Sequence, residues 1–410
     1  QTQLETRQGH HRKILLGGMA NSSVFSPVLL PGRRLGSFEL GATIASVVDV
    51  LREDSFTFRK VAVEFCVEDL VSADLSLSLT ENGTRLRFDP VSQRLRLIEV
   101  FDLSRLSIFY SGSSCCGAVS PTFRLIYDLF GPTYPGEYDA AKQLYWLQYP
   151  GVAFAFPIPA EYSKLYAGPS GTELPLTLPN GEAPVASSIR VFSGSDRSAP
   201  VLPPLPANSF HMEPVVAEVH KGATWSVRGC SVTFSSTPQD VISDLGSPCT
   251  VVHKRLNKLR IHESEESVDG TGCSDYFFNY PALGVDLLFD IRTHTVRKLV
   301  FHTNSPADGD FNVYTKCNIA LQLTALDGTA VTVGPDARWE ELQAILGEPT
   351  RPAVHNNNST SPTKQSFSAS SSSEACPFGP SLFYCYPGLI LEVAKSGSLL
   401  TVILFSEGNA

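Results

Sequence analysis

Asp275-Tyr-Phe-Phe-Asn-Tyr280 and Gly284-Val-Asp-Leu-Leu-Phe-Asp290 stand three residues apart in a chain of 410 residues. Aromatic and branched aliphatic side chains are enriched in strands, and the Pro281 to Leu283 connection with its following glycine is typical of a turn. After a second turn at Arg292 to His294 comes a third such run, Val296-Arg-Lys-Leu-Val-Phe301. Connections this short cannot make a parallel crossover, so antiparallel strands are predicted.

A helix is predicted before these strands. Ser235-Ser-Thr-Pro-Gln-Asp240 offers a capping hydroxyl, an early proline and an acidic residue, which together favour a helix start. Apolar side chains then follow at helical spacing up to Leu245, and Gly246 and Pro248 are typical of a helix end. The order is therefore a helix, then Leu-Gly-x-Pro, then a loop, then an aromatic strand and two further strands.

The same order occurs three more times. The last copy has a helix at Trp339 to Leu346 and strands at Leu382 to Tyr386, Leu389 to Val393 and Leu399 to Leu404. The second copy has a helix at Thr122 to Phe130 and strands at Gln143 to Tyr149, Val152 to Phe156 and Ser188 to Phe192. The first and most diverged copy has a helix at Thr43 to Leu51 and strands at Leu75 to Leu79, Thr84 to Asp89 and Leu95 to Phe101.

The sequence therefore predicts an α+β protein with four diverged helix-plus-antiparallel-sheet repeat units stacked in one elongated or two-lobed body. The predicted organisation is a flexible N-terminal segment at 1–34, repeat unit 1 at 35–112, repeat unit 2 at 118–193, a Pro-rich linker or arm at 194–228, repeat unit 3 at 229–325, and repeat unit 4 at 330–408 with a disordered Ser- and Asn-rich loop at 355–375.

Composition argues against two classes of protein. The formal net charge of -9 is spread along the chain, whereas a nucleic-acid binder concentrates positive charge on one face. Nine cysteines without CxxC spacing argue against a disulfide scaffold or a zinc ribbon and predict a reducing compartment. The sequence contains no run of about 20 apolar residues, so it predicts no membrane-spanning helix. A place in the cytoplasm, or peripherally on a membrane, is expected.

A search for catalytic patterns gives no candidate. The Gly-x-Ser-x-Gly motif of a serine nucleophile and the glycine-rich loops that hold phosphates do not occur. Asp286 and Asp290 would share one face of a strand, which is expected to be a polar face. A zinc site could be drawn from His262, His294, His302, Cys273 and Cys317, but no pair has metal-ligand spacing. The sequence predicts no catalytic, cofactor-binding or metal-binding residues.

Four polar residues of repeat unit 3 are candidates for a partner interface: Asp275, Asn279, His302 and Asn304. They lie within or beside strongly apolar strands. Buried polar groups need hydrogen-bond partners, so two interpretations are open. The four side chains satisfy one another inside the fold, or they line a surface that meets a partner.

The most basic short run is His253 to His262, which contains Lys254, Arg255, Lys258 and Arg260. On a strand, three of these cations would share one face. The run is a candidate for binding an acidic partner or a lipid head group, and the alternative is a solvated hairpin.

Repeat unit 3 also resembles a known family. Cys273-Ser-Asp-Tyr-Phe-Phe-Asn-Tyr280, Leu283-Gly-Val-Asp-Leu-Leu-Phe-Asp290, His302-Thr-Asn304 and Phe311-Asn-Val-Tyr314 are similar to the phagosome assembly factor family. Upstream, Ile98-Glu-Val-Phe-Asp-Leu103 and Phe130-Gly-Pro-Thr133 continue the resemblance, which covers roughly residues 35 to 405.

This resemblance implies a role in autophagy. Members of the family pair with a large β-propeller protein that recognises phosphoinositides, and the pair associates with the phagophore assembly site and the autophagosome membrane. No catalytic residues are implied. The expected function is a non-enzymatic adaptor, with direct phosphoinositide or membrane-surface binding as the alternative and an unrecognised enzyme as the least favoured reading.

Overall fold

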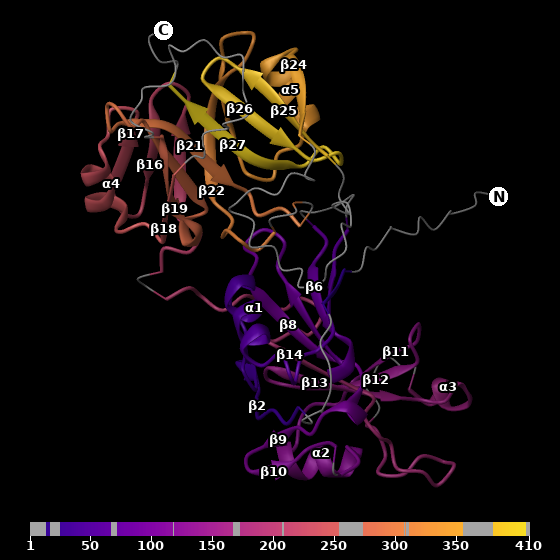
Figure 1. The fold of residues 1–410 in the computed structure, drawn as a ribbon. Helices are drawn as coiled ribbons and strands as arrows, with labels where there is room; N and C mark the ends of the chain where they lie inside the picture. The colour runs from indigo at the N-terminus through magenta and orange to yellow at the C-terminus, as the bar shows by residue number, and fades with distance from the viewer. Residues whose placement is uncertain are drawn as a thin grey trace, which may run out of the picture. The chain divides into compact units, whose positions relative to one another are not determined.

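The computed structural model describes residues 14–16, 25–66, 72–117, 119–166, 173–206, 209–253, 274–306, 308, 311–355 and 380–406. The chain divides into two compact parts, Gln1–Ala207 and Asn208–Ala410, called here the N-terminal and C-terminal halves (Figure 1). Each half combines short helices with a large antiparallel sheet, which confirms the predicted mixture of helices and antiparallel strands.

The N-terminal half is built on a nine-stranded sheet with the order β1-β5-β6-β7-β8-β14-β13-β12-β11, and all neighbouring strands are antiparallel. Its strands are β1 (Ile14–Leu16), β5 (Val61–Glu64), β6 (Leu75–Leu79), β7 (Thr84–Phe88), β8 (Leu95–Val100), β11 (Glu137–Asp139), β12 (Leu144–Tyr149), β13 (Val152–Pro157) and β14 (Ser188–Phe192). The helices are α1 (Ile44–Glu53), α2 (Phe123–Phe130) and the short α3 (Ser163–Tyr166).

Smaller strands precede and follow α1. A three-stranded sheet holds β2 (Leu29–Leu30), β3 (Arg34–Leu35) and β4 (Phe38–Glu39), and a pair holds β9 (Phe109–Tyr110) and β10 (Ser113–Ser114). The prediction of a flexible segment over 1–34 therefore needs correction at its end. Phe25 lies against the rings of Phe38 and Phe58, and Leu29 is fully buried. Residues 1–13 and 17–24 lie outside the described residues.

The C-terminal half holds an eight-stranded sheet with the order β18-β19-β20-β21-β27-β26-β25-β24 and a five-stranded sheet with the order β17-β16-β15-β22-β23. The larger sheet contains β18 (Thr250–His253), β19 (Tyr276–Tyr280), β20 (Val285–Phe289), β21 (Val296–His302), β24 (Thr350–His355), β25 (Ser381–Tyr386), β26 (Leu389–Val393) and β27 (Leu399–Phe405). The smaller contains β15 (Pro214–Glu218), β16 (Gly222–Trp225), β17 (Cys230–Thr233), β22 (Asn318–Thr324) and β23 (Ala330–Val333), and the helices are α4 (Pro238–Leu245) and α5 (Trp339–Leu346).

The two large sheets share one strand order. The closing strands β8 and β14 pair in the middle of the first sheet, as β21 and β27 do in the second. The connections also correspond. A 3-10 turn closed by a left-handed glycine follows β6 and β19, at Gly83 and Gly284, whereas Pro-Gly dipeptides ending in Gly151 and Gly388 connect β12 to β13 and β25 to β26. In each half, two of the predicted strand sets thus form one continuous sheet.

The recurring tyrosine and glycine contact each other. The hydroxyl of Tyr280, the last residue of β19, donates a hydrogen bond of 2.9 Å to the carbonyl of Gly246, which ends α4. Tyr149 and Tyr386 make the same bond to the glycines that end α2 and α5, at 3.0 and 2.9 Å. These glycines have φ between 78° and 89°, where a side chain would be strained. The motif therefore fastens the ends of α2, α4 and α5 to their sheets.

The core of the C-terminal half lies between its two sheets. Trp225 of β16, Phe289 of β20 and Phe301 of β21 are almost fully buried in one hydrophobic cluster, and burying side chains of this size stabilises the fold by about 1.5–3 kcal/mol each. The predicted linker or arm at 194–228 therefore needs correction. It contains β15 and β16, and β15 pairs in parallel with β22. The predicted disordered loop at 355–375 lies outside the described residues except for His355 in β24.

Candidate functional site

Polar side chains meet on the face of the eight-stranded sheet that is turned away from the core. Asn279 of β19 and Asp286 of β20 stand directly opposite each other in the ladder. Because side chains alternate between the faces of a strand, Val285 and Leu287 enter the core, while Asp286 points to the other side. His302, at the end of β21, and Tyr314, in the loop before β22, complete the group, called here the Asp286 cluster.

The Asp286 carboxylate is the centre of this group. Its Oδ1 accepts a hydrogen bond of 2.8 Å from the side-chain amide of Asn279. Its Oδ2 accepts one of 2.7 Å from the hydroxyl of Tyr314 and lies 3.1 Å from His302 Nε2. The side-chain Oδ1 of Asn279 in turn accepts a hydrogen bond of 3.2 Å from the hydroxyl of Thr250 of β18. The cluster thus connects β18, β19, β20, β21 and one loop.

The geometry favours an anchoring role over a catalytic one. The rings of His302 and Tyr314 stack at 3.7 Å with an angle of 7° between their planes. Only 16% of the His302 side chain and 11% of the Asp286 side chain are exposed. The Asp286 carboxylate accepts hydrogen bonds from Asn279 and Tyr314 and contacts the ring of His302, so both of its oxygens are occupied within the fold. It holds the loop that carries Tyr314 against the sheet.

The same place in the N-terminal sheet carries different residues. Ser78 and Arg85 stand opposite each other in β6 and β7, as Asn279 and Asp286 do in β19 and β20. Arg85 donates a hydrogen bond of 3.1 Å to the Ser78 hydroxyl and lies over the exposed ring of Phe101 at 5.7 Å. At this position the N-terminal sheet therefore has an arginine in place of the Asp286 carboxylate.

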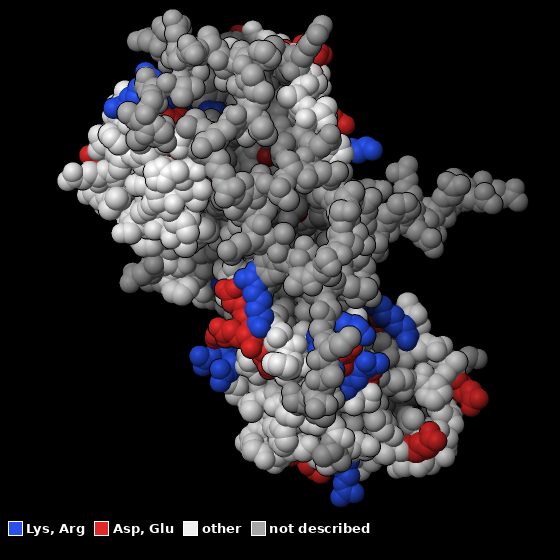
Figure 2. All heavy atoms as spheres, in the orientation of Figure 1, with Lys and Arg blue, Asp and Glu red and all other residues white. Residues whose placement is uncertain are grey.

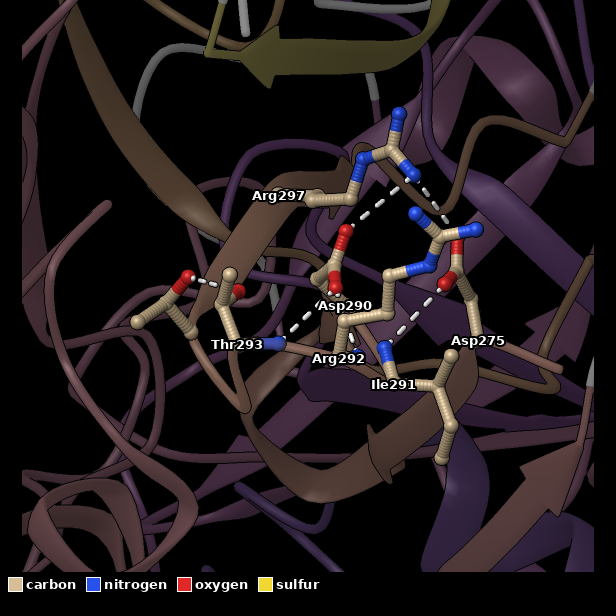
Figure 3. Close-up of polar contacts among 7 residues, drawn as sticks. Asp275, Asp290, Ile291, Arg292, Thr293 and Arg297 are labelled. Carbon is tan, nitrogen blue, oxygen red and sulfur yellow. Dashed lines mark hydrogen bonds and ion pairs between the residues drawn. The ribbon is translucent and has the colours of Figure 1, made fainter. Parts of the chain in front are cut away.

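Asp275 belongs to a separate group of charges at the end of the sheet (Figure 3). One oxygen accepts a hydrogen bond from the backbone N–H of Ile291 at 3.2 Å, and the other lies 3.1 Å from the guanidinium of Arg297. Arg297 also reaches Asp290 at 3.5 Å. Burial acts to raise the pKa of Asp290, but the backbone N–H groups of Thr293 and Arg292 and the charge of Arg297 outweigh it and lower the pKa below its usual value.

Comparison with known proteins places the chain in a family. The family model described as phagosome assembly factor 1, PHAF1, matches residues 34–405. The chain is 36% identical to a PHAF1 protein of Arabidopsis thaliana over 411 residues, which cover 97% of this chain and 96% of the relative. It is 30% identical to a PHAF1 protein of Drosophila melanogaster and 26% identical to one of Caenorhabditis elegans, each time over 90% of both chains.

The chain belongs to the PHAF1 family. No solved structure matches it. The resemblance that the sequence motifs indicate is thereby confirmed over the whole range predicted for it, and the family is named for phagosome assembly.

The structure of this PHAF1 family member brings together two of the four predicted interface residues. Asn279 and His302 both contact Asp286, whereas Asp275 joins Arg297. Asn304 stands apart. Its backbone is left-handed, with φ 49°, and its side-chain oxygen accepts a hydrogen bond of 2.7 Å from the backbone N–H of Asn312. Asn279 and Asn304 are only 5% and 7% exposed. The contacts of these two residues therefore fit side chains that are hydrogen-bonded inside the fold better than side chains that line a surface.

The candidates Lys254, Arg255, Lys258 and Arg260 lie outside the described residues, so binding of an acidic partner or a lipid head group by this run stays a prediction. Sequence reasoning missed Asp286 and Tyr314 as members of the cluster. Tyr314 is 28 residues from Asp286 along the chain, and only the strand register and the path of the loop place the two together.

Three further candidate residues, Cys115, Cys317 and His294, are buried or held in contacts within the fold. Within the described ranges, no group of three His, Cys, Asp or Glu side chains is arranged to hold a metal ion. His294 instead contacts the Tyr276 hydroxyl at 3.0 Å. Burial raises the pKa of the Cys317 thiol to about 12, and burial also raises that of Cys115 to about 12. Thiolate is the nucleophilic form, so these two thiols are protected.

Charges of both signs lie on the face of the PHAF1 chain that Figure 2 shows. Positive and negative side chains lie beside each other there. On the outer face of the nine-stranded sheet, Arg87 and Arg190 both pair with Glu99, at 2.9 Å each. Among the residues that the structure describes, no helix has the length and apolar composition needed to cross a membrane.

Proposed function

We propose that this PHAF1 family member is a non-enzymatic adaptor in autophagosome assembly, which acts by binding a β-propeller protein at the forming membrane. The observation that carries the proposal is the family match over residues 34–405. The family is named for phagosome assembly, and the resemblance in repeat unit 3 implies the β-propeller partner and the recruitment to the phagophore.

The geometry of the polar groups supports binding over catalysis. The Asp286 carboxylate accepts hydrogen bonds from Asn279 and Tyr314 and contacts His302. The Asp275 carboxylate is held by a backbone N–H group and by Arg297. These two carboxylates are the best candidates for acid and base chemistry on this sheet. The oxygen atoms of both are occupied by contacts within the fold.

The repeated architecture also supports an adaptor. We infer that the four helix-and-sheet sets are diverged copies, because the strand order and the glycine turns recur and the tyrosine-to-glycine bond occurs in three of the four sets. Two large sheets of this kind offer wide faces and long edges. Such surfaces suit the binding of proteins.

Affinity purification tests the proposal. A tagged full-length chain is recovered from extract of cells in which the protein occurs, and the co-purifying proteins are identified by mass spectrometry. We expect a β-propeller protein in amounts comparable to the bait. Binding of the purified chain alone to phosphoinositide-containing vesicles, without any such partner, would instead favour the direct lipid-binding alternative.

A further inference from the structure

A short stretch at the end of the N-terminal half is dominated by proline. It reads Ala199-Pro-Val-Leu-Pro-Pro-Leu-Pro206, and a proline occupies every third position from Pro200 to Pro206. Proline fixes its own φ and biases the residue before it toward extended backbone. Every residue of the stretch except Val201 is a proline or precedes one. The stereochemistry therefore favours a polyproline II helix, which has about three residues per turn.

The structure shows this stretch, called here the proline segment (residues 199–206), as an exposed extended chain. Between β14 and β15, none of the described residues belongs to a helix or a strand. The side chains of Val201 and Leu205 are 59% and 43% exposed, and Pro204 and Pro206 are exposed as well. The segment therefore offers apolar side chains to the solvent rather than to the core.

Contacts with the N-terminal half hold the middle of the segment in place. The guanidinium Nη2 of the buried Arg94 donates a hydrogen bond of 2.8 Å to the Pro203 carbonyl, and the Pro203 ring lies against Gly41. The backbone N–H of Val201 donates one of 2.8 Å to the carbonyl of Ser193. A ligand that is already fixed in an extended conformation loses less entropy when it binds. The fold thus presents the proline segment ready for recognition.

The same contacts decide which edge of the segment is available. In a polyproline II helix, residues three apart lie on one edge. Pro200 and Pro203 share the edge that faces the N-terminal half, and both are half-buried. Val201 and Pro204 share the next edge and are both exposed, as is the dipeptide Leu205–Pro206. A binding protein can therefore reach these side chains without displacing the contacts that hold the segment.

The cation nearest to the segment in sequence is occupied within the fold. The guanidinium of Arg197 lies 5.3 Å from the centre of the Trp146 ring, and its Nη1 lies 2.7 Å from a carboxylate oxygen of Glu137. Only 12% of the Arg197 side chain is exposed. Recognition of the segment therefore depends on its proline and leucine side chains rather than on an ion pair.

We propose that the proline segment is a binding site for a protein domain whose groove is lined by aromatic side chains, of the kind found in SH3 and WW domains. Such grooves take polyproline II ligands, because the ligand is extended before it binds and its rings pack against the aromatic side chains. This surface is separate from the contact with the β-propeller protein. It would give the adaptor a second partner of different chemistry.

Matched variants of the full-length chain test the site. One carries Pro204→Ala together with Pro206→Ala, and another carries Leu205→Asp; all three side chains are exposed. The control is Pro179→Ala, which changes an exposed proline outside the segment. Each chain is immobilised and tested against a panel of purified SH3 and WW domains encoded in the same genome. Thermal unfolding checks that the variants fold like the wild type.

We expect at least one domain of the panel to bind the wild-type chain and the Pro179→Ala variant equally. Its affinity for the other two variants should fall at least about tenfold, because they remove the proline rings or place a charge in the groove. Replacing an aromatic residue of the domain's groove with alanine should abolish the binding.

Three results would overturn the site. If no domain of the panel binds the wild-type chain at micromolar concentration, the segment serves only as a connection between the halves. Equal binding of the wild type and both segment variants would place the contact elsewhere on the chain. Binding that survives the loss of the groove's aromatic residue would contradict the proposed chemistry. None of these results bears on the β-propeller partner, which affinity purification tests separately.

Discussion

Replacing Asp286 with alanine is expected to destabilise the C-terminal half strongly. The substitution removes the acceptor for Asn279 and Tyr314 and the contact to His302, at 2.8, 2.7 and 3.1 Å. A buried polar group left without a partner costs about 1–3 kcal/mol, and the three losses are not additive because the groups can rearrange. We expect a loss of about 3 kcal/mol in the free energy of unfolding. In a part of this size, that loss lowers the melting temperature by about 6–12 °C.

Thermal and urea denaturation of the full-length protein measure this effect. The control is Asp128→Ala, since Asp128 is exposed and its carboxylate lies 3.9 Å from Arg124. An exposed ion pair contributes about 0–1 kcal/mol. If Asp286→Ala unfolds within about 0.5 kcal/mol of the wild type, the anchoring role of the cluster is refuted. If stability holds and partner capture falls, the interface interpretation of Asn279 and His302 returns.

Further predictions concern single bonds and titrating groups. Tyr280→Phe removes the hydrogen bond to the Gly246 carbonyl and should cost about 1 kcal/mol by urea denaturation; an unchanged midpoint would show that the motif does not fasten the helix. Cys317 should resist a maleimide at pH 7.5 while the exposed Cys249 reacts, and labelling of both at equal rates by mass spectrometry would contradict the burial. The lowered pKa of Asp290 contributes stability that is present above the unfolded value of about 3.9 and is lost as the pH falls through the folded value. The stability difference between wild type and Asp290→Asn should therefore vanish in acid, and a constant difference from pH 7 to pH 2 would refute this.

The sequence predicts the central elements of each half closely. The helix predicted at Trp339 to Leu346 has the same bounds as α5, and the strands predicted at Leu75 to Leu79 and Ser188 to Phe192 have the same bounds as β6 and β14. These elements carry strong local signals. A capping threonine precedes α4, a left-handed glycine follows it, and the central strands are buried nearly throughout.

The edge strands could not be predicted in the same way. Thr250, Val251 and His253 of β18 and residues 352–354 of β24 are exposed, so these strands lack the apolar runs that identify a buried strand. The strands β15 and β16 lie beyond a Pro-rich stretch, which favours the prediction of a linker. β15 pairs with β22, about a hundred residues away, and β16 joins the same sheet through β15, and no local pattern shows such a contact.

The candidate site is only partly visible in the sequence for a similar reason. Asn279 and His302 stand out because polar residues interrupt apolar strands. Asp286 also lies in such a strand, but its role depends on the register that places it opposite Asn279. Tyr314 has no distinguishing pattern of its own. The loop path that brings its hydroxyl to Asp286 is decided by tertiary structure.

Co-elution of the purified chain with the purified β-propeller partner tests the adaptor function most directly. Size-exclusion chromatography with light scattering gives the mass of each species, and the free chain has a mass of 44.5 kDa. The account predicts one peak whose mass equals the sum of both proteins in a fixed ratio. Separate elution of the two wild-type proteins at micromolar concentration would contradict it.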